Sequence, residues 1–352
     1  GKAEALVARF GERGFDYAGN ARVDLAVWDR AHGALVVNAG DGLARAAAQR
    51  CELLGHLPAT GGGLKAWLRA LRLHQWLKNL LVFIPLLAAH RFLEPAAVLA
   101  SVAGFLAFGL CASGVYVLND LLDLPSDRQH PRKRLRPFAA GALPLLPGIV
   151  LAPVLALAGL ALAWITEPRF AAVLAAYYLL TLGYSLRFKR VAMLDVMLLA
   201  MLYTLRIIGG TAVIGATPSF WLLAFSMFIF LSLALLKRYV ELASMLAEGK
   251  ISAAGRGYGV DDLPLLQSLG GSAGYLAVLV LALYINSPES IALYSRPQLL
   301  WLLCPLVLYW VSRTWVVAHR GQMDDDPVVF AVTDRVSQVV GVLCAVIALG
   351  AI

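Results

Sequence analysis

Nine apolar segments, each long enough to span or nearly span a bilayer, constrain the fold of this chain more than any other feature. Because a backbone in lipid must satisfy its own hydrogen bonds, such segments fold as helices. The composition agrees, since 60% of the residues are hydrophobic and the mean hydropathy is +0.73. We predict an all-α polytopic membrane protein with nine transmembrane helices, whose approximate cores are Trp76–Ala89, Leu99–Leu118, Leu143–Ile165, Phe170–Leu186, Val191–Ile214, Ser219–Leu236, Leu266–Tyr284, Leu299–Val317 and Ser337–Ile352.

Positive charge is distributed unevenly among the connections between these segments. Lys and Arg concentrate before the first segment and after the second, fourth and sixth, whereas the opposite side carries few, such as Arg91, Arg169 and Arg296. By the positive-inside rule we expect an integral protein of the inner (cytoplasmic) membrane with its N-terminus inside. The formal net charge of +8 then reflects cytoplasmic loops and anionic lipid, with no nucleic acid as a partner. The four cysteines are scattered and give no disulfide or zinc pattern.

The first sixty residues differ in kind from the rest. A helix over Ala3–Phe10 and short strands over Asp16–Asn20 and Ala34–Asn38, with a helix between them, form an αβαβ remnant too short to bury a core alone. Thr60–Gly63 is a plausible linker, so we expect a remnant with its linker at 1–60 and a transmembrane domain at 61–352. Because the chain starts with Gly1 rather than Met, we expect the native N-terminus to be missing.

The second apolar segment ends in Asn119-Asp120-Leu121-Leu122-Asp123-Leu124-Pro125-Ser126-Asp127, followed by a strongly basic loop. Three carboxylates at a membrane boundary are costly unless a cation offsets them, and Mg²⁺ is the obvious one. In an unbroken helix they would share a face, but Pro125 indicates that Asp127 projects from the first loop residues. The nearby cations suggest a Mg²⁺-bound, phosphate-rich ligand, and they are Arg128, Arg132, Lys133, Arg134 and Arg136.

Other charges lie in or at the ends of the apolar segments. Asp195 and Arg206, about three turns apart, share a helix face and could be an internal ion pair. Lys237 and Glu241 could be an ordinary pair one turn apart, and Asp334, next to Arg335, could complement a helix N-terminus. Because nearly all of these groups belong to cytoplasmic helix ends, one cavity could instead collect them.

Three stretches resemble the UbiA superfamily of intramembrane prenyltransferases: the Asn119–Asp127 motif, Gln75-Trp76-Leu77-Lys78-Asn79, and Tyr184-Ser185-Leu186-Arg187-Phe188-Lys189 with Asp195. The resemblance covers roughly Leu64 to Ile352. It implies nine transmembrane helices around a central cavity that faces the cytoplasm, with Mg²⁺ held by aspartates that binds the pyrophosphate of the substrate.

One departure from that family narrows the expected chemistry. Aromatic prenyltransferases of the superfamily carry a second Asp-rich motif after the sixth helix, whereas this chain has Lys237-Arg238-Tyr239-Val240-Glu241. Cations at that place suit a phosphate without a metal bridge. The pattern resembles the decaprenyl-phosphate phosphoribosyltransferase branch, which implies Mg²⁺-dependent transfer of 5-phosphoribose from phosphoribosyl pyrophosphate to a polyprenyl phosphate, a cell-envelope lipid, with release of pyrophosphate.

Two other functions stay open from the sequence. One is transfer of a prenyl group from prenyl pyrophosphate to an aromatic acceptor, and the other is a non-enzymatic transporter or lipid-binding protein. The resemblance assigns catalysis to Asp120, Asp123, Lys237 and Tyr239, and the metal to Asp120, Asp123 and Asp127. It assigns substrate binding to Lys78, Asn79, Asn119, Arg132, Lys133, Arg134, Arg136, Tyr184, Lys189, Arg206, Arg238, Glu241, Asp334 and Arg335.

Two further expectations concern the loop at Gly249–Asp262 and the oligomeric state. The loop is rich in glycine and carries Arg256 and Tyr258, so it could cover the cavity or be a plain connector. The sequence leaves the oligomeric state open, including a homo-oligomer.

The N-terminal piece resembles the tail of a haloacid-dehalogenase-like phosphatase. Gly19-Asn20-Ala21-Arg22-Val23-Asp24 stands where that family has G-D-x-x-x-D, and Asn20 replaces the first Asp. The nucleophile motif D-x-D is not recognisable in this piece, so we expect it to be catalytically dead. A fused phosphatase in the missing part could remove the 5-phosphate from the lipid-linked phosphoribose.

Overall fold

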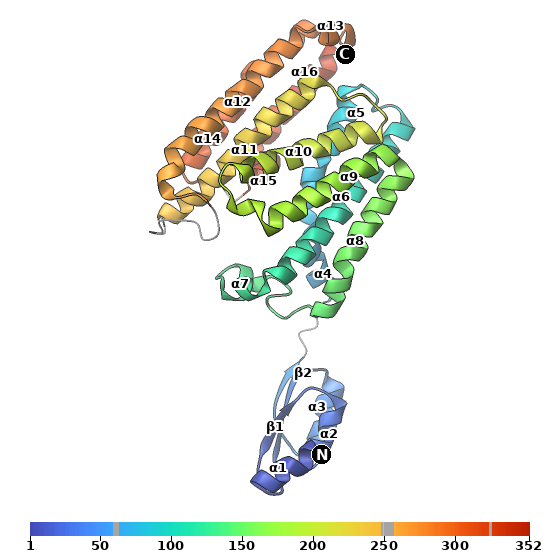
Figure 1. The fold of residues 1–352 in the computed structure, drawn as a ribbon, viewed down its shortest axis with the longest axis vertical. Coiled ribbons are helices and arrows are strands. Elements are labelled where there is room, and N and C mark those ends of the chain that lie inside the picture. The colour runs from blue at the N-terminus through green and yellow to red at the C-terminus, as the bar shows by residue number, and fades with distance from the viewer. Residues whose placement is uncertain (59–62, 248, 250–256, 324–325) are drawn as a thin grey trace. The chain divides into compact units, whose positions relative to one another are not determined.

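The computed structural model describes residues 1–58, 63–247, 249, 257–323 and 326–352. They form two compact units, drawn in Figure 1. The first combines Gly1–Arg69 with Leu124–Pro144, and the second combines Ala70–Asp123 with Leu145–Ile352. Most of the predicted linker, residues 60–62, lies outside the described residues, and the domain boundary at residue 60 stays a prediction.

The first unit contains a small parallel sheet in the order β1-β2-β3. Trp28 is fully buried beside it and donates from Nε1 to the Tyr17 carbonyl at 2.8 Å. The predicted first helix and two strands are confirmed, but the third strand was not predicted, because Gly55 and Pro58 are typical of turns. The elements are α1 (Lys2–Phe10), β1 (Asp16–Gly19), η1 (Arg22–Asp24), α2 (Leu25–Trp28), β2 (Gly33–Ala39), α3 (Asp41–Ala48) and β3 (Glu52–Pro58).

The segment after the acidic motif also belongs to the first unit. It forms a short helix, α7 (Leu124–Gln129), and a 3₁₀ turn, η3 (Lys133–Leu135). Pro125 does end the preceding long helix as predicted, but it also fits the first turn of a new helix. Asp127 therefore lies in α7, and the prediction that it projects from a loop is wrong.

The second unit is helical. Its long helices are α6 (Pro95–Leu122), α8 (Leu145–Thr166), α9 (Pro168–Leu186), α10 (Leu194–Val213), α11 (Phe220–Ala247), α12 (Leu263–Ile285), α14 (Leu303–His319) and α16 (Arg335–Ala351). Shorter pieces are η2 (Leu73–Phe83), α5 (Ile84–Ala88), η4 (Phe188–Arg190), η5 (Val260–Asp262), α13 (Pro288–Leu293), η6 (Pro297–Leu302) and α15 (Pro327–Thr333). The helix α4 (Leu64–Leu71) joins the two units in sequence.

The described residues contain seven helices long and apolar enough to cross a membrane. An eighth span is possible if α15 and α16, which meet at a 73° bend, cross together. The first of the nine predicted spans is instead η2 and α5, and these 3₁₀ and α turns are shorter than the roughly 20 residues that a spanning helix needs. The prediction of a polytopic helical membrane protein is confirmed, with seven or eight candidate spans rather than nine.

Close packing sets the positions of α10, α11, α12 and η2 relative to one another in the second unit. Helix α11 packs against α10 and α12, and α10 also packs against η2. At the η2 contact, a Cβ added to Gly210 would lie 2.2 Å from the Val82 carbonyl oxygen. Only glycine allows the two backbones to approach this closely, and the approach sets η2 against α10.

We expect Gly210→Ala to lower the thermal stability of the purified protein, because its methyl group would overlap rigid backbone. The matched control is Gly341→Ala in α16, where an added Cβ meets nothing within 4 Å. Alanine is favoured over glycine in a helix by about 1 kcal/mol, so the control should be neutral or stabilising. The melting temperature of each variant in detergent is compared with that of the wild-type protein. Equal melting temperatures for Gly210→Ala and Gly341→Ala would contradict the close contact.

Candidate functional site

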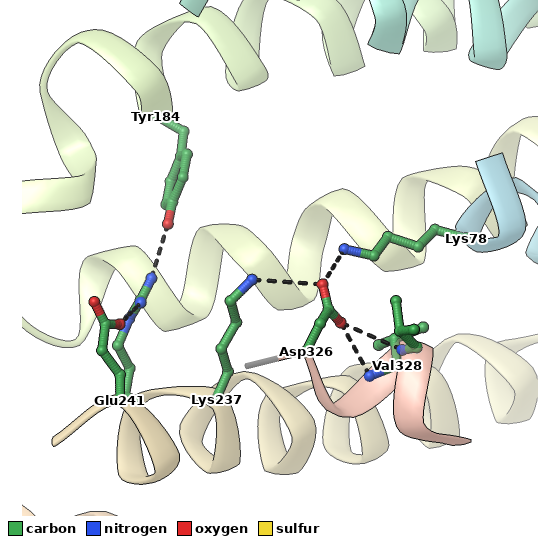
Figure 2. A network of polar contacts seen from close by, with 8 residues as sticks. Lys78, Tyr184, Lys237, Glu241, Asp326 and Val328 are labelled. Atoms are coloured by element: carbon green, nitrogen blue, oxygen red, sulfur yellow. Dashed lines mark hydrogen bonds and ion pairs between the residues drawn. The ribbon is translucent and has the colours of Figure 1, made fainter. Parts of the chain in front are cut away.

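Arg238 is the most thoroughly paired charge in the helical unit. Its side chain is 1% exposed, and Nε donates to Asp195 Oδ2 at 2.5 Å. One terminal nitrogen donates to Glu241 Oε2 at 2.5 Å and the other to the Tyr184 hydroxyl at 2.9 Å, the contact shown in Figure 2. Two carboxylates and a phenol therefore hold the guanidinium in place. Of the alternatives for Asp195, an ion pair is correct, but its partner is Arg238 rather than Arg206.

Asp195 also ties a loop to the start of α10. Its Oδ1 accepts a hydrogen bond from the Tyr258 hydroxyl at 2.7 Å, and that hydroxyl accepts one from the Met193 backbone N–H at 2.6 Å. Burial and the hydrogen bond to the Asp195 carboxylate raise the pKa of Tyr258. Residues 250–256 of the predicted covering loop lie outside the described residues, so a covering role stays a prediction.

Lys78 and Lys237 converge on one carboxylate oxygen. Lys78 Nζ lies 2.5 Å from Asp326 Oδ2, and Lys237 Nζ lies 3.6 Å from the same atom. Figure 2 shows the two side chains reaching Asp326 from η2 and α11. Burial would raise the pKa of Asp326, but the two ammonium groups outweigh it and lower that pKa. Lys237 thus contacts a different group from its neighbour Arg238, although the two are adjacent in sequence.

Arg206 is a buried cation without an acidic partner among the described residues. It is 5% exposed, and its three nitrogens donate to Asn79 Oδ1 at 2.9 Å, the Leu202 carbonyl at 2.7 Å and the Tyr177 hydroxyl at 2.8 Å. Asn79 is 1% exposed, and its Nδ2 has no hydrogen-bond partner in the part of the chain that the structure describes. A buried positive charge beside an unused buried donor favours an anion.

The acidic motif lies at the C-terminal end of α6. Asp120 is 2% exposed and its Oδ1 accepts a hydrogen bond from Arg72 Nη2 at 2.5 Å. Asp123 Oδ2 lies 3.8 Å from Lys189 Nζ. Asn119 Nδ2 donates to the Ser185 hydroxyl at 3.1 Å, which joins the ends of α6 and α9.

The donors at this end of α6 fit Mg²⁺. Asp120 lies in the last turn of α6, Asp123 is the C-cap of this helix three residues on, and the Asn119 amide adds a third hard oxygen. Mg²⁺ commonly takes only one or two protein carboxylates and completes its shell with phosphate and water. Among the described residues no three His, Cys, Asp or Glu side chains gather into a metal site, so the remaining ligands would be phosphate and water.

The third aspartate and the basic loop belong to the first unit. There Arg136 Nη1 donates to Asp127 Oδ2 at 2.7 Å. Arg132, Lys133 and Arg134 lie in and beside η3 and are exposed. Their predicted roles in metal and substrate binding stay predictions.

Three more predicted site residues lie towards the C-terminus. The Tyr239 hydroxyl is 2.8 Å from His319 Nδ1, so α11 is joined here to the end of α14. Asp334 caps α16 by accepting from the Ser337 backbone N–H at 2.8 Å and also pairs with Arg313 at 2.7 Å. Arg335 is exposed. The helix-terminus alternative for Asp334 is therefore correct, and any role of Asp334 and Arg335 with substrate stays a prediction.

Sequence reasoning missed several partners in these networks. Arg72, Tyr177, His319 and Asp326 were not singled out, and Tyr258 was noted only as part of a loop. For Asp326 a signal exists, because an aspartate directly before a proline is typical of a helix N-terminus. For the others, only the packing of distant segments brings them to their partners.

Comparison with known proteins finds a family and several relatives. A family model described as "UbiA prenyltransferase family" matches residues 80–335 of this chain. "Uncharacterized protein y4nM" of Sinorhizobium fredii is 39% identical over 94% of this chain, which spans 65% of that relative. "Nodulation protein NoeC" of Azorhizobium caulinodans is also 39% identical, over 77% of this chain and 88% of NoeC. A decaprenyl-phosphate phosphoribosyltransferase of Mycolicibacterium smegmatis is 31% identical, over 77% of this chain and 87% of its own length.

Solved structures share the fold. A UbiA homolog from Archaeoglobus fulgidus, solved bound to GPP and Mg²⁺, superposes with a TM-score of 0.60 at 16% identity. The match covers 81% of this chain and 97% of that one.

We expect Asp195→Asn to destabilise the helical unit by about 3 kcal/mol, because it removes one charge from a buried ion pair. Thermal stability in detergent measures the effect. The control is Glu94→Gln, which breaks the exposed pair with Arg91 and should cost no more than about 1 kcal/mol. A loss for Asp195→Asn no larger than for the control would show that the buried network does not hold these helices together.

Proposed function

The chain belongs to the UbiA prenyltransferase family of membrane transferases, and we propose that it transfers 5-phosphoribose from phosphoribosyl pyrophosphate to a polyprenyl phosphate. The C1–O bond to pyrophosphate breaks, and a phosphate oxygen of the lipid forms a new bond to C1. Pyrophosphate leaves with the bonding electrons. Both substrates carry phosphate, so the enzyme must bind two anions side by side.

One observation carries this proposal: positive charge exceeds negative charge around Lys78, Lys237 and Arg206. Asp326 is the single carboxylate that contacts any of the three in the described part of the chain. In the aromatic branch of the superfamily, acids at the place of Lys237 and Arg238 help to bind a metal. Cations there suit a phosphate that binds directly.

The acidic end of α6 serves the donor in this proposal. Asp120 and Asp123 would hold Mg²⁺, and Asp127 is a further predicted ligand. When bound, Mg²⁺ neutralises charge on the departing pyrophosphate. Arg72 and Lys189 contact these two aspartates, and in this proposal they orient the pyrophosphate oxygens.

The acceptor needs no strong general base, because a lipid phosphate is already an anion at neutral pH. Alignment is the main task of the protein, and holding two reactants in place can be worth several kcal/mol. The prenyl chain would lie along apolar helices and in the bilayer. The relative named as a decaprenyl-phosphate phosphoribosyltransferase supports this choice of substrates, since the match covers most of both chains.

We expect purified protein in detergent to move label from radioactive phosphoribosyl pyrophosphate into an extractable polyprenyl phosphate only when Mg²⁺ is present. Asp123→Asn should reduce the rate at least about 100-fold, because the donor loses a charged metal ligand. Glu167→Gln, which alters the helix cap of α9, should keep the wild-type rate.

Two results would contradict the proposal. One is transfer that persists with excess EDTA or in the Asp123→Asn protein. The other is an active preparation that uses prenyl pyrophosphate and an aromatic acid but never phosphoribosyl pyrophosphate.

A further inference from the structure

On the basis of the function proposed above, we propose that Asp326 is a positioning residue: it holds Lys78 and Lys237 together as a single site for the phosphate of the lipid acceptor. Asp326 lies outside the three stretches on which the resemblance to the family rests. Its place in the chain, before α15, is far in sequence from η2 and α11, which carry the two lysines.

The Asp326 carboxylate is fixed by its own helix. Oδ1 accepts hydrogen bonds from the backbone N–H groups of Val328 and Val329, at 3.1 and 3.4 Å, and so caps α15. Oδ2 is the oxygen that both lysines contact. Lysine side chains are long and have many rotamers, so a fixed oxygen between them supplies the order that they lack.

The same geometry brings two like charges close together. The Lys78 Nζ and Lys237 Nζ atoms lie 2.5 Å and 3.6 Å from the same oxygen, Asp326 Oδ2, so the two ammonium groups are close to each other. Without Asp326 they would repel each other and separate. With it, the three groups carry a net charge of +1. Each ammonium has three donors; Lys78 gives one to Asp326, and Lys237 forms an ion pair with it at 3.6 Å, so donors remain for a phosphate.

The surroundings distinguish this cluster from a structural ion pair. In the structural pairs described above, the carboxylates match or outnumber the cation, as in Arg313 with Asp334 and Arg238 with Asp195 and Glu241. Here Arg206 adds to the excess of positive charge. Lys78 Nζ lies 5.9 Å and Arg206 Cζ 5.5 Å from the centre of the same Tyr203 ring. Asn79, next to Lys78, keeps its unused buried donor. Such an excess of partly buried positive charge favours a bound anion.

The lipid phosphate fits this cluster better than the donor does. The pyrophosphate of the donor is assigned to the acidic end of α6, where carboxylates can share a metal with it. Among the described residues the lysine cluster has a single carboxylate, that of Asp326. Its Oδ2 already contacts both ammonium groups. A phosphate monoester that binds without metal suits it. The 5-phosphate of the donor and free inorganic phosphate have the same chemistry, and the experiment must separate them.

The test is Asp326→Asn, which removes the charge but keeps a good helix cap. We expect the KM for polyprenyl phosphate to rise about tenfold, as for loss of one charge-assisted contact, and the KM for phosphoribosyl pyrophosphate to stay within about twofold. A raised KM for the donor alone would assign the cluster to its 5-phosphate and overturn the proposal. An unchanged or lower KM for the acceptor would overturn it as well.

A double-mutant cycle separates positioning from a distant effect. If Asp326 acts through the lysines, Asp326→Asn should cost less in the Lys237→Ala background than in the wild-type protein, because one of its two lysine contacts is already lost. Fully additive effects would show that Asp326 acts independently of Lys237. Glu167→Gln again serves as the control for a cap substitution outside the cluster.

A binding measurement keeps the test independent of turnover. Farnesyl phosphate, added in the presence of EDTA, should raise the melting temperature of the wild-type protein. The Asp326→Asn protein should need about a tenfold higher concentration of farnesyl phosphate for the same rise. Inorganic phosphate at the same concentrations should have little effect. Wild-type protein that lacks phosphoribosyl transfer yet shows this shift would refute the proposed function while supporting the role of Asp326. No difference between wild type and Asp326→Asn would refute that role.

Discussion

A charged side chain in an apolar interior is stable only when another charge or a ligand offsets it, and the helical unit is organised around this constraint. Arg238 meets it within the protein, since Asp195 and Glu241 take its donors, and the pair with Asp195 joins α10 to α11. Lys78 and Lys237 meet it only in part, because they share the Asp326 carboxylate, and Arg206 has no carboxylate partner among the described residues. The remaining positive charge is what an anionic substrate can use.

Two kinds of phosphate recognition follow from this distribution of charge. The end of α6 supplies carboxylates and an amide, which suit a phosphate that arrives with Mg²⁺. The cluster of Lys78, Lys237 and Asp326 supplies donors that suit a phosphate without metal. Membership of the UbiA family establishes a membrane transferase, and this separation of charge is the reason to propose a pyrophosphate donor together with a phosphate acceptor.

The sequence predicted the helical membrane fold well, because apolar length and charged loops are local signals. It failed where local signals mislead: η2 and α5 are apolar yet too short for an ordinary span, and Asp127 lies in a new helix that Pro125 starts. It could also name Lys237 and Arg238 as a pair but could not separate their roles. That separation depends on Asp195 and Asp326, which only the packing of distant helices brings to α11.

The most direct test of two distinct phosphate sites is the Mg²⁺ dependence of binding, measured separately for each substrate by titration calorimetry in detergent. We expect phosphoribosyl pyrophosphate to bind only with Mg²⁺, and farnesyl phosphate, a short form of the acceptor, to bind equally well with Mg²⁺ or EDTA. A strict Mg²⁺ requirement for farnesyl phosphate would contradict the account, because the lysine cluster would then not bind phosphate directly.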